Sequence, residues 1–354
     1  MSAAETLLGR SRAPFLPDEV WAWSDTTKDD VLIDRRVDPR AWRDAADADV
    51  VLVTQWNDGR ADTPAWLPTC SASMPRTVRD MLGALDLRAG QRVLEIGTGT
   101  GYTAALLKDR VGPDGSVVTV EVDPVLAADA RGRLEAAGLD VDVTAGDGFD
   151  LDAAALGAFD RVHVTCGVRR IPASWLRLCP RGRVVMPFGV TIDDPHDRLL
   201  VLDVTDGEAS GRFGAELAFM MARHQRLAHW EWPDTGEAAD VDLGLTWEDV
   251  DFALHEPHTF ALGLMLQGAT FRVSEVTAGE PVVWLALDGS AASIGFAAGR
   301  SSSVAGDRDL ANRFAAAVRW WLGHGRPEPG VLGLTVTAGS GRYCRQVAWV
   351  RPPT

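Results

Sequence analysis

The hydrophobic pattern of the chain is most regular between residues 92 and 189. Short apolar runs of strand type alternate there with longer segments in which apolar residues recur at helical spacing. The pattern predicts strands at 92–96, 116–122, 141–146, 159–167 and 182–189, and helices at 102–111, 124–138 and 171–179. Such alternation predicts a parallel sheet with helices on both faces.

The pattern changes on both sides of this region. Residues 1–68 are rich in Trp, Asp and Pro and are expected to be irregular. A helix is predicted at 74–85, with Pro75 in its first turn. Residues 197–205 and 214–222 are predicted as two strands of a hairpin that closes around 206–211.

The C-terminal part has a different pattern of predicted strands and helices. Residues 229–242 have the composition of an exposed linker. Strands are predicted at 269–277, 281–289, 333–339 and 344–350, together with a helix at 307–325 that Asp307 or Asp309 would cap. We therefore predict an N-terminal lead segment (1–72), a catalytic domain (73–223) and an α+β accessory domain (224–354).

Composition and charge narrow the class of protein. The chain has 354 residues and a net charge of −15, which argues against a nucleic-acid partner. No apolar run reaches the roughly 18 residues of a membrane helix, and the N-terminus lacks a secretion signal. The four cysteines lack metal-ligand spacing, so we expect no metal, reduced thiols and a cytoplasmic location.

A glycine-rich turn follows the first strand of the predicted sheet. Glu95, Gly97, Gly99 and Gly101 give it the spacing ExGxGxG. Glycines let a ligand approach the backbone, and the helix that follows offers unpaired N–H groups. Dinucleotide turns place the third glycine one residue later and lack the acid, so Glu95 favours a ligand with an amino group.

Two further acids end the next two strands. Glu121, at the end of the second strand, is placed to accept hydrogen bonds from ribose hydroxyls. Asp147, after the third, is placed to accept one from an adenine amino group. The carboxyl ends of parallel strands meet at one edge of a sheet, so these acids and the turn together predict a site for S-adenosylmethionine.

Residues 73–189 resemble the protein-L-isoaspartate O-methyltransferases. The resemblance lies in "VLEIGTGTGY" (93–102), in "GDGFDLDAAALGAFDRVHVTCG" (146–167), in "IPASWLRLCPRGRVVMPFG" (171–189) and in "SMPRTVRDM" (73–81). It implies a Rossmann-like class I methyltransferase sheet, here with a C-terminal α+β extension. It also implies Ser73 as the active-site serine and S-adenosylmethionine as the cofactor. The cofactor-binding candidates are Glu95, Gly97, Thr98, Gly99, Gly101, Tyr102, Glu121, Asp147, Gly148 and Thr165.

The chain departs from the pattern of the repair enzymes at several points. Met74 replaces a glutamine, Cys166-Gly167 replaces two alanines, and about 130 residues follow the catalytic region. The element "SASMP" (71–75) after "TQWNDG" (54–59), together with the C-terminal extension, resembles an actinobacterial branch that methylates an aspartate in a cyclised, ribosomally made peptide, whose ester then forms aspartimide. That reaction is our leading hypothesis. The alternatives are repair of isoaspartate in damaged proteins, and a degenerate methyltransferase that serves as a binding module.

The proposed chemistry needs few protein groups. A carboxylate has a pKa of about 4, so it is already ionised and needs no general base. Ser73 is expected to hydrogen-bond the acceptor carboxylate, or else only to cap the helix after it. His163 is expected to be a packed histidine.

Six tryptophans either line a peptide groove or belong to a satellite core: Trp42, Trp56, Trp66, Trp230, Trp232 and Trp247.

Overall fold

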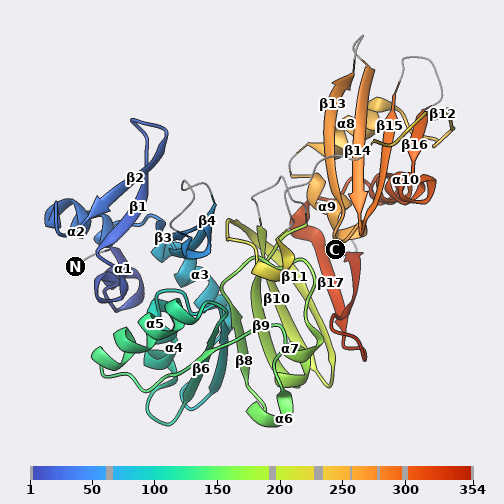
Figure 1. The fold of residues 1–354 in the computed structure, drawn as a ribbon. Coiled ribbons are helices and arrows are strands. Elements are labelled where there is room, and N and C mark those ends of the chain that lie inside the picture. Colours follow the sequence, from blue (N-terminus) through green and yellow to red (C-terminus); the bar gives the residue numbers. More distant parts are fainter. Residues whose placement is uncertain are drawn as a thin grey trace.

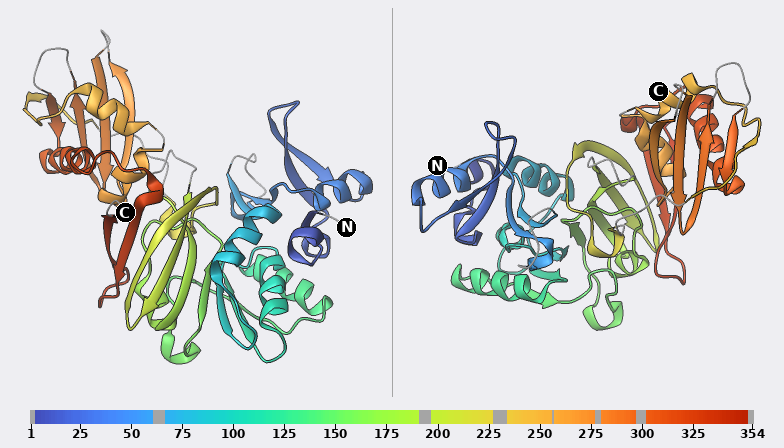
Figure 2. Two further views of the ribbon diagram at one scale, coloured as in Figure 1. Left: turned by 180° about the vertical axis from the view of Figure 1, so that it is seen from behind. Right: turned by 45° about the horizontal axis from the view of Figure 1, so that its top comes forward.

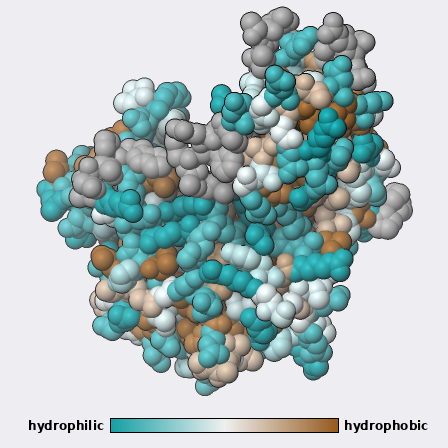
Figure 3. All heavy atoms as spheres, turned by 45° about the vertical axis from the view of Figure 1, so that its right-hand side comes forward, coloured by the Kyte–Doolittle hydropathy of each residue, from teal (hydrophilic) through white to brown (hydrophobic). Residues whose placement is uncertain are grey.

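The computed structural model describes residues 3–60, 67–190, 197–226, 234–255, 257–276, 280–296 and 302–351. Three sheets organise these residues, with the N-terminal segment and the C-terminal unit standing on either side of the central sheet (Figures 1 and 2). Hydrophilic residues cover most of the face drawn in Figure 3. In the described part of the chain, none of the helices has the length and apolar character needed to span a membrane.

The central sheet has nine strands in the order β18-β17-β11-β10-β9-β8-β5-β6-β7. The strands from β9 to β7 are parallel, and the others are joined antiparallel. The bounds of the strands are β5 (Arg92–Ile96), β6 (Ser116–Glu121), β7 (Asp142–Ala145), β8 (Arg161–Val164), β9 (Arg181–Phe188), β10 (Asp197–Thr205), β11 (Glu208–Leu217), β17 (Leu332–Thr337) and β18 (Arg345–Val350). The chain runs outward from β5 in both directions, which creates a switch point beside this strand.

Successive residues of these strands point to opposite faces of the sheet and enter different cores. Val93 packs with α3 (Pro75–Leu85), α4 (Tyr102–Val111) and α5 (Pro124–Ala136). Leu94 packs in the other core, which contains α7 (Ala173–Leu178) and adjoins the short helix α6 (Ala153–Leu156). Both faces of the parallel part are therefore covered, as the alternation of strands and helices predicts.

The hairpin after β10 is tighter than expected. Its turn is Asp206-Gly207, and both residues have positive φ, so β11 already begins at Glu208. Asp-Gly is the preferred pair for such two-residue turns, which makes the prediction of a turn over 206–211 wrong. As a consequence β11 ends at Leu217, and residues 218–222 leave the sheet.

The N-terminal segment is not irregular, contrary to our expectation. It contains α1 (Ala3–Leu8), α2 (Pro39–Asp47) and an antiparallel sheet in the order β2-β1-β3-β4. These strands are β1 (Glu19–Ser24), β2 (Asp29–Asp34), β3 (Leu52–Trp56) and β4 (Pro68–Ala72). Strands of five or six residues with polar connections give too little periodicity to be detected from the pattern alone.

The C-terminal residues form a third sheet in the order β12-β16-β15-β14-β13. Its strands are β12 (Ala239–Asp240), β13 (Thr270–Val276), β14 (Glu280–Leu287), β15 (Ser290–Gly295) and β16 (Ser303–Gly306), and α8 (Trp247–Leu254), α9 (Thr259–Met265) and α10 (Arg308–Gly323) pack with it. Asp307 caps α10, as one of our two predictions states. The predicted linker at 229–242 falls partly outside the described residues.

The end of the chain returns to the central sheet. We expected all of 224–354 to form one separate unit, but β17 pairs with β11 and β18 with β17. Leu332, Leu334 and Val336 are buried in the core of the central sheet, and this burial explains the return. The domain boundaries at 72/73 and 223/224 stay predictions.

Candidate active site

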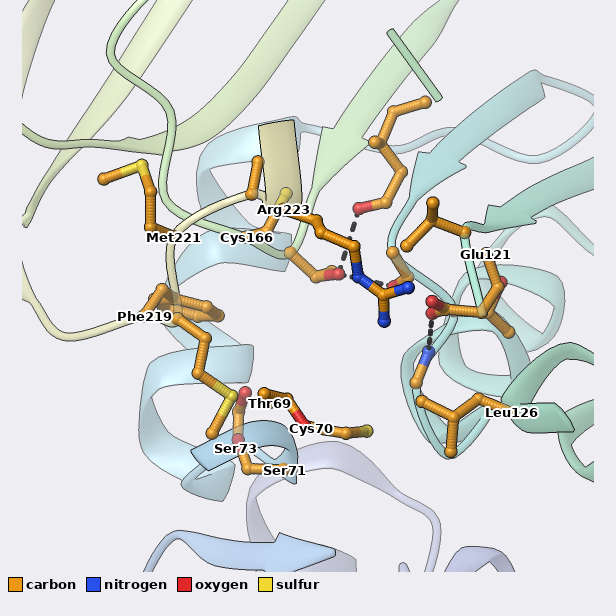
Figure 4. Close-up of a pocket in the computed structure, with 18 of the residues that line it drawn as sticks. Thr69, Cys70, Ser71, Ser73, Glu121, Leu126, Cys166, Phe219, Met221 and Arg223 are labelled. Atoms are coloured by element: carbon orange, nitrogen blue, oxygen red, sulfur yellow. Dashed lines mark hydrogen bonds between the residues drawn. The ribbon is translucent and has the colours of Figure 1, made fainter. Parts of the chain in front are cut away.

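A cavity of about 450 Å³ lies at the carboxyl ends of the parallel strands, beside β5. This is the switch point at which open α/β sheets bind their ligands, and the volume suits a small cofactor. Three walls surround it: the ends of β5, β6, β7 and β8, the segment 67–77 around β4, and residues 218–226 after β11. Figure 4 shows side chains from all three walls converging on the cavity.

The glycine turn forms the floor of the cavity. Gly97 has a φ of +93°, and a Cβ at this residue would lie 2.5 Å from the Thr165 hydroxyl oxygen. A side chain is therefore excluded here by both backbone conformation and space. Gly97, Thr98, Gly99 and Thr165 all line the cavity.

Gly101 and Tyr102 stand behind this turn. Gly101 is the N-cap of α4 and packs on Ala130 of α5, and it does not line the cavity. Tyr102 borders the cavity, but its hydroxyl donates to the Arg10 carbonyl oxygen at 2.8 Å. Burial raises the pKa of Tyr102 to about 12, so its phenol stays protonated at neutral pH.

Glu121 holds the turn from the neighbouring strand. One carboxylate oxygen accepts from the Gly99 backbone N–H at 2.9 Å, and the other accepts from that of Asp123 at 3.1 Å. Glu121 is nearly buried, with 7% of its surface exposed, and it borders the cavity. Its negative charge is thus held at the end of β6, facing the cavity from beside Leu126 (Figure 4).

Glu95 lies apart from the cavity. It is fully buried and does not line the wall. Its neighbours in the sheet are Thr119 on β6 and His163 on β8. The Thr119 hydroxyl donates to Glu95 Oε2 at 2.7 Å, and burial raises the pKa of the carboxyl group. The structure therefore does not bring this acid to a ligand amino group.

His163 is packed, as expected. It is 1% exposed, and its Nδ1 lies 3.7 Å from Glu95 Oε1, too far for a hydrogen bond. Neither ring nitrogen has a hydrogen-bond partner among the described residues.

Asp147 and Gly148 form the wall that follows β7. The Asp147 carboxylate accepts from the Phe149 N–H at 2.9 Å, and its other oxygen contacts the side chains of Arg342 and His224. Gly148 is held by the buried Trp175, whose indole N–H donates to its carbonyl oxygen at 2.7 Å. A Cβ on Gly148 would lie 2.7 Å from Ile96 Cγ2, so this close approach requires glycine.

Ser73 borders the cavity on the side of α3. The N-cap residue of this helix is Met74, so Ser73 precedes the cap and is not the capping residue. Its backbone is held by Arg12, a fully buried side chain whose guanidinium donates to the carbonyl oxygens of Ser73, Ala45, Ala46, Ala48 and Val50. Burial lowers the pKa of Arg12 to about 10, which leaves it charged at neutral pH.

Two cysteines also border the cavity. Cys70 lies on β4 beside Gly99, and Cys166 follows β8. Burial raises the pKa of each thiol to about 12, which makes them unreactive at neutral pH. All four cysteines of the chain are free.

The third wall was missed by the sequence analysis. Arg223 reaches over the cavity (Figure 4), and its guanidinium contacts Asp58 at 2.9 Å and Asp123 at 3.5 Å. Arg226 contacts Asp58 at 2.8 Å. These pairs join the N-terminal segment to residues after β11. The assignment of 214–222 to a strand concealed this wall, and the Asp-Gly turn pair was the signal that would have corrected it.

Two of the six candidate tryptophans pack in hydrophobic cores, and a third is half-buried. Trp42 is buried in the N-terminal core, and its indole donates to the Pro17 carbonyl oxygen. Trp247 packs against Phe296 in the C-terminal unit. Both belong to cores and not to a groove. Trp56 is half-buried beside Trp21, and Trp66, Trp230 and Trp232 lie outside the described residues. Within the described ranges, there is no group of three or more metal-ligating side chains.

The sequence around this site is similar to that of known proteins. Residues 59–224 match the sequence model of protein-L-isoaspartate(D-aspartate) O-methyltransferase. The chain is 40% identical over 144 residues to protein-L-isoaspartate O-methyltransferase 2 of Archaeoglobus fulgidus, which covers 38% of this chain and 63% of that protein. It is 40% identical over 156 residues to protein-L-isoaspartate O-methyltransferase of Methanopyrus kandleri, with 42% and 66% covered. The chain thus spans less than two thirds of these relatives.

The fold is shared over a longer stretch. A solved structure entitled protein-L-isoaspartate O-methyltransferase superimposes with a TM-score of 0.54 at 21% identity, over 86% of this chain and 87% of that chain. The expected Rossmann-like class I methyltransferase sheet with a C-terminal extension is confirmed. The likeness in fold extends well beyond residues 59–224.

Proposed function

We propose that this chain is an S-adenosylmethionine-dependent carboxyl O-methyltransferase that acts on isoaspartyl residues of proteins or peptides. The observation that carries the proposal is the cavity at the switch point, with Glu121 and Asp147 along one side and Ser73 on another. The sequence match over 59–224 supports the same activity.

The residues of the cavity fit the cofactor. Gly97 lets the Thr165 hydroxyl pack against the turn, where a Cβ would meet it, and the turn residues Gly97, Thr98 and Gly99 line the cavity. Glu121 and Asp147 would accept hydrogen bonds from the ribose hydroxyls and the adenine amino group. Carboxylates at these positions suit a nucleoside without phosphates. When bound, the cofactor supplies a methyl group on a positively charged sulfur.

Methyl transfer then requires mainly positioning. The acceptor carboxylate is ionised at neutral pH, so no residue has to remove a proton. Ser73 would donate a hydrogen bond to one carboxylate oxygen and so orient the other toward the methyl group. Arg12 fixes the backbone of Ser73 for this task. Such positioning can lower the activation barrier by roughly 7 kcal/mol or more.

Isoaspartate is the acceptor favoured by the comparisons. Both relatives named above are isoaspartate methyltransferases by name, and so is the solved structure that shares the fold over most of this chain. The extra length of the chain does not favour the peptide substrate, because that solved structure matches 86% of the residues. We therefore place repair of isoaspartate ahead of our leading hypothesis.

Methylation of aspartate in a cyclised peptide is the second candidate. Met74 and Cys166, two of the departures from the repair pattern, both border the cavity. Met74 alters the wall beside Ser73, where the acceptor would lie, and Cys166 alters the wall that follows β8. In this case segments 1–72 and 224–354 would flank the acceptor and recognise the peptide.

The test compares three acceptors with labelled S-adenosylmethionine: a linear isoaspartyl peptide, the same peptide with aspartate, and a cyclised aspartyl peptide. Transfer to the isoaspartyl peptide alone supports the proposal. Transfer only to the cyclised peptide, followed by loss of methanol, supports the second candidate. Cofactor binding in calorimetry without transfer to any acceptor would favour the binding-module alternative.

A further inference from the structure

The carboxylate of Asp147 contacts two side chains, Arg342 and His224, that come from distant parts of the chain. Arg342 Nη2 and His224 Nε2 each lie 2.9 Å from Asp147 Oδ2. Arg342 is 195 residues away in sequence, in the loop between β17 and β18, far beyond the match at 59–224. The C-terminal end of the chain therefore contributes a side chain that contacts Asp147, a residue of the cavity wall.

The backbone around Arg342 is fixed independently of this ion pair. The Arg342 carbonyl oxygen accepts from the Ala173 N–H at 2.9 Å, and the Cys344 N–H donates to the Ile171 carbonyl oxygen at 2.8 Å. Tyr343 forms a bridge with Pro172, and the Arg170 guanidinium lies over its ring at 4.4 Å. The loop is thus joined to the segment after β8, and β17 is joined to β11.

The two oxygens of Asp147 have different partners. Oδ2 contacts both Arg342 and His224, whereas Oδ1 accepts one hydrogen bond, from the Phe149 N–H. A carboxylate oxygen can accept about two hydrogen bonds, so Oδ1 keeps a free lone pair. Because Arg342 and His224 contact Oδ2 while the Phe149 N–H binds Oδ1, rotation of the carboxylate would break these contacts, so its orientation is fixed.

We propose that Arg342 is a positioning residue that holds Asp147 so that Oδ1 accepts from the exocyclic amino group of adenine. The C-terminal hairpin would thereby set the preference of the site for adenine over a base with a carbonyl group at the same position. This inference rests on the proposed function, because it needs S-adenosylmethionine or its product in the cavity.

The test measures binding of two probes by calorimetry: S-adenosylhomocysteine, and S-inosylhomocysteine, in which a carbonyl group replaces the amino group. The variants are Arg342→Gln, Arg342→Lys and the matched control Arg345→Gln, an exposed arginine three residues further along. Circular dichroism and the melting temperature check that each variant is folded.

Arg342→Gln is expected to weaken S-adenosylhomocysteine about fivefold, the upper range for a half-exposed ion pair, and to leave S-inosylhomocysteine unchanged or slightly tighter. The ratio of the two affinities should therefore fall, Arg342→Lys should restore part of it, and Arg345→Gln should match wild type. An unchanged ratio, or an equal loss for both probes, would overturn the inference. If wild type binds neither probe, the proposed function itself fails.

Discussion

Replacement of Gly97 by alanine tests whether the glycine turn is required by its geometry. Gly97 has a φ of +93°, and an alanine in the left-handed region costs about 1–2 kcal/mol. The new Cβ would lie 2.5 Å from Thr165 Oγ1. That hydroxyl donates to the Ile96 carbonyl oxygen at 3.0 Å, and its displacement costs about 1 kcal/mol more. Gly97→Ala should therefore lower the free energy of unfolding by about 2–3 kcal/mol.

Urea denaturation measures this change, and Gly132→Ala is its matched control. Gly132 is exposed within α5, and a Cβ there would meet nothing within 4 Å. Alanine is the better helix former, so this variant should be more stable than wild type by about 0.5–1 kcal/mol. The two substitutions are chemically identical and are expected to have opposite signs.

A second substitution separates the two costs of Gly97→Ala. Thr165→Ala alone should cost about 1 kcal/mol, because it removes the hydroxyl that bonds Ile96. Added to Gly97→Ala, it should cost almost nothing further. Gly97→Ala has already broken the hydrogen bond of Thr165, and alanine at 165 removes the group with which the new Cβ clashes. Equal stability of Gly97→Ala and wild type would refute the reasoning. Full additivity of the two variants would refute the contact between Cβ and Thr165.

Three further predictions concern acids and the serine. Glu121→Ala should weaken S-adenosylmethionine binding by about 1.5–3 kcal/mol in calorimetry, and unchanged affinity would remove Glu121 from the site. Ser73→Ala should lower the rate of methyl transfer about 10-fold or more with cofactor affinity nearly intact, and a wild-type rate would contradict its role. The buried Glu95 has a raised pKa, so the folded state binds more protons between the ordinary and the raised value. Stability should therefore fall as pH rises through that window, and a Glu95→Gln variant with the same slope in urea titrations would argue against this.

The parallel half of the fold was predictable because its signals are local. Each strand is a short apolar run, and each helix has its own start or stop residue, such as Pro75 at the first turn of α3 and Gly112 after α4. The glycine turn is equally local, since its residues are consecutive. The return of β17 to the central sheet left no such signal. β11 and β17 are more than 100 residues apart in the sequence. Their pairing depends on which edge of the central sheet is free, and the hydrophobic periodicity of a segment gives no information about that.

The candidate site divides in the same way. The strand ends carry their acids within motifs, so Glu121 and Asp147 could be assigned to the cavity from sequence. The wall after β11 could not, because the turn takes only two of the six residues predicted for it, and the strand therefore ends five residues earlier than predicted. Arg342 could not be predicted as part of the site, because the pairing of β17 with β11 brings it beside Asp147.

Glu95 shows why motif spacing alone does not place a side chain. Successive residues on a strand point to opposite faces of the sheet. The Glu95 side chain lies on the same face as the side chains of its partners on the neighbouring strands, Thr119 and His163. It reaches the cavity only through hydroxyl groups: Thr119 donates to Glu95, and Thr98, which lines the cavity, lies 2.7 Å from the Thr119 oxygen. The acid therefore acts on the turn by orienting Thr98. A substitution at Glu95 should disturb the shape of the turn before it changes the charge that a ligand meets.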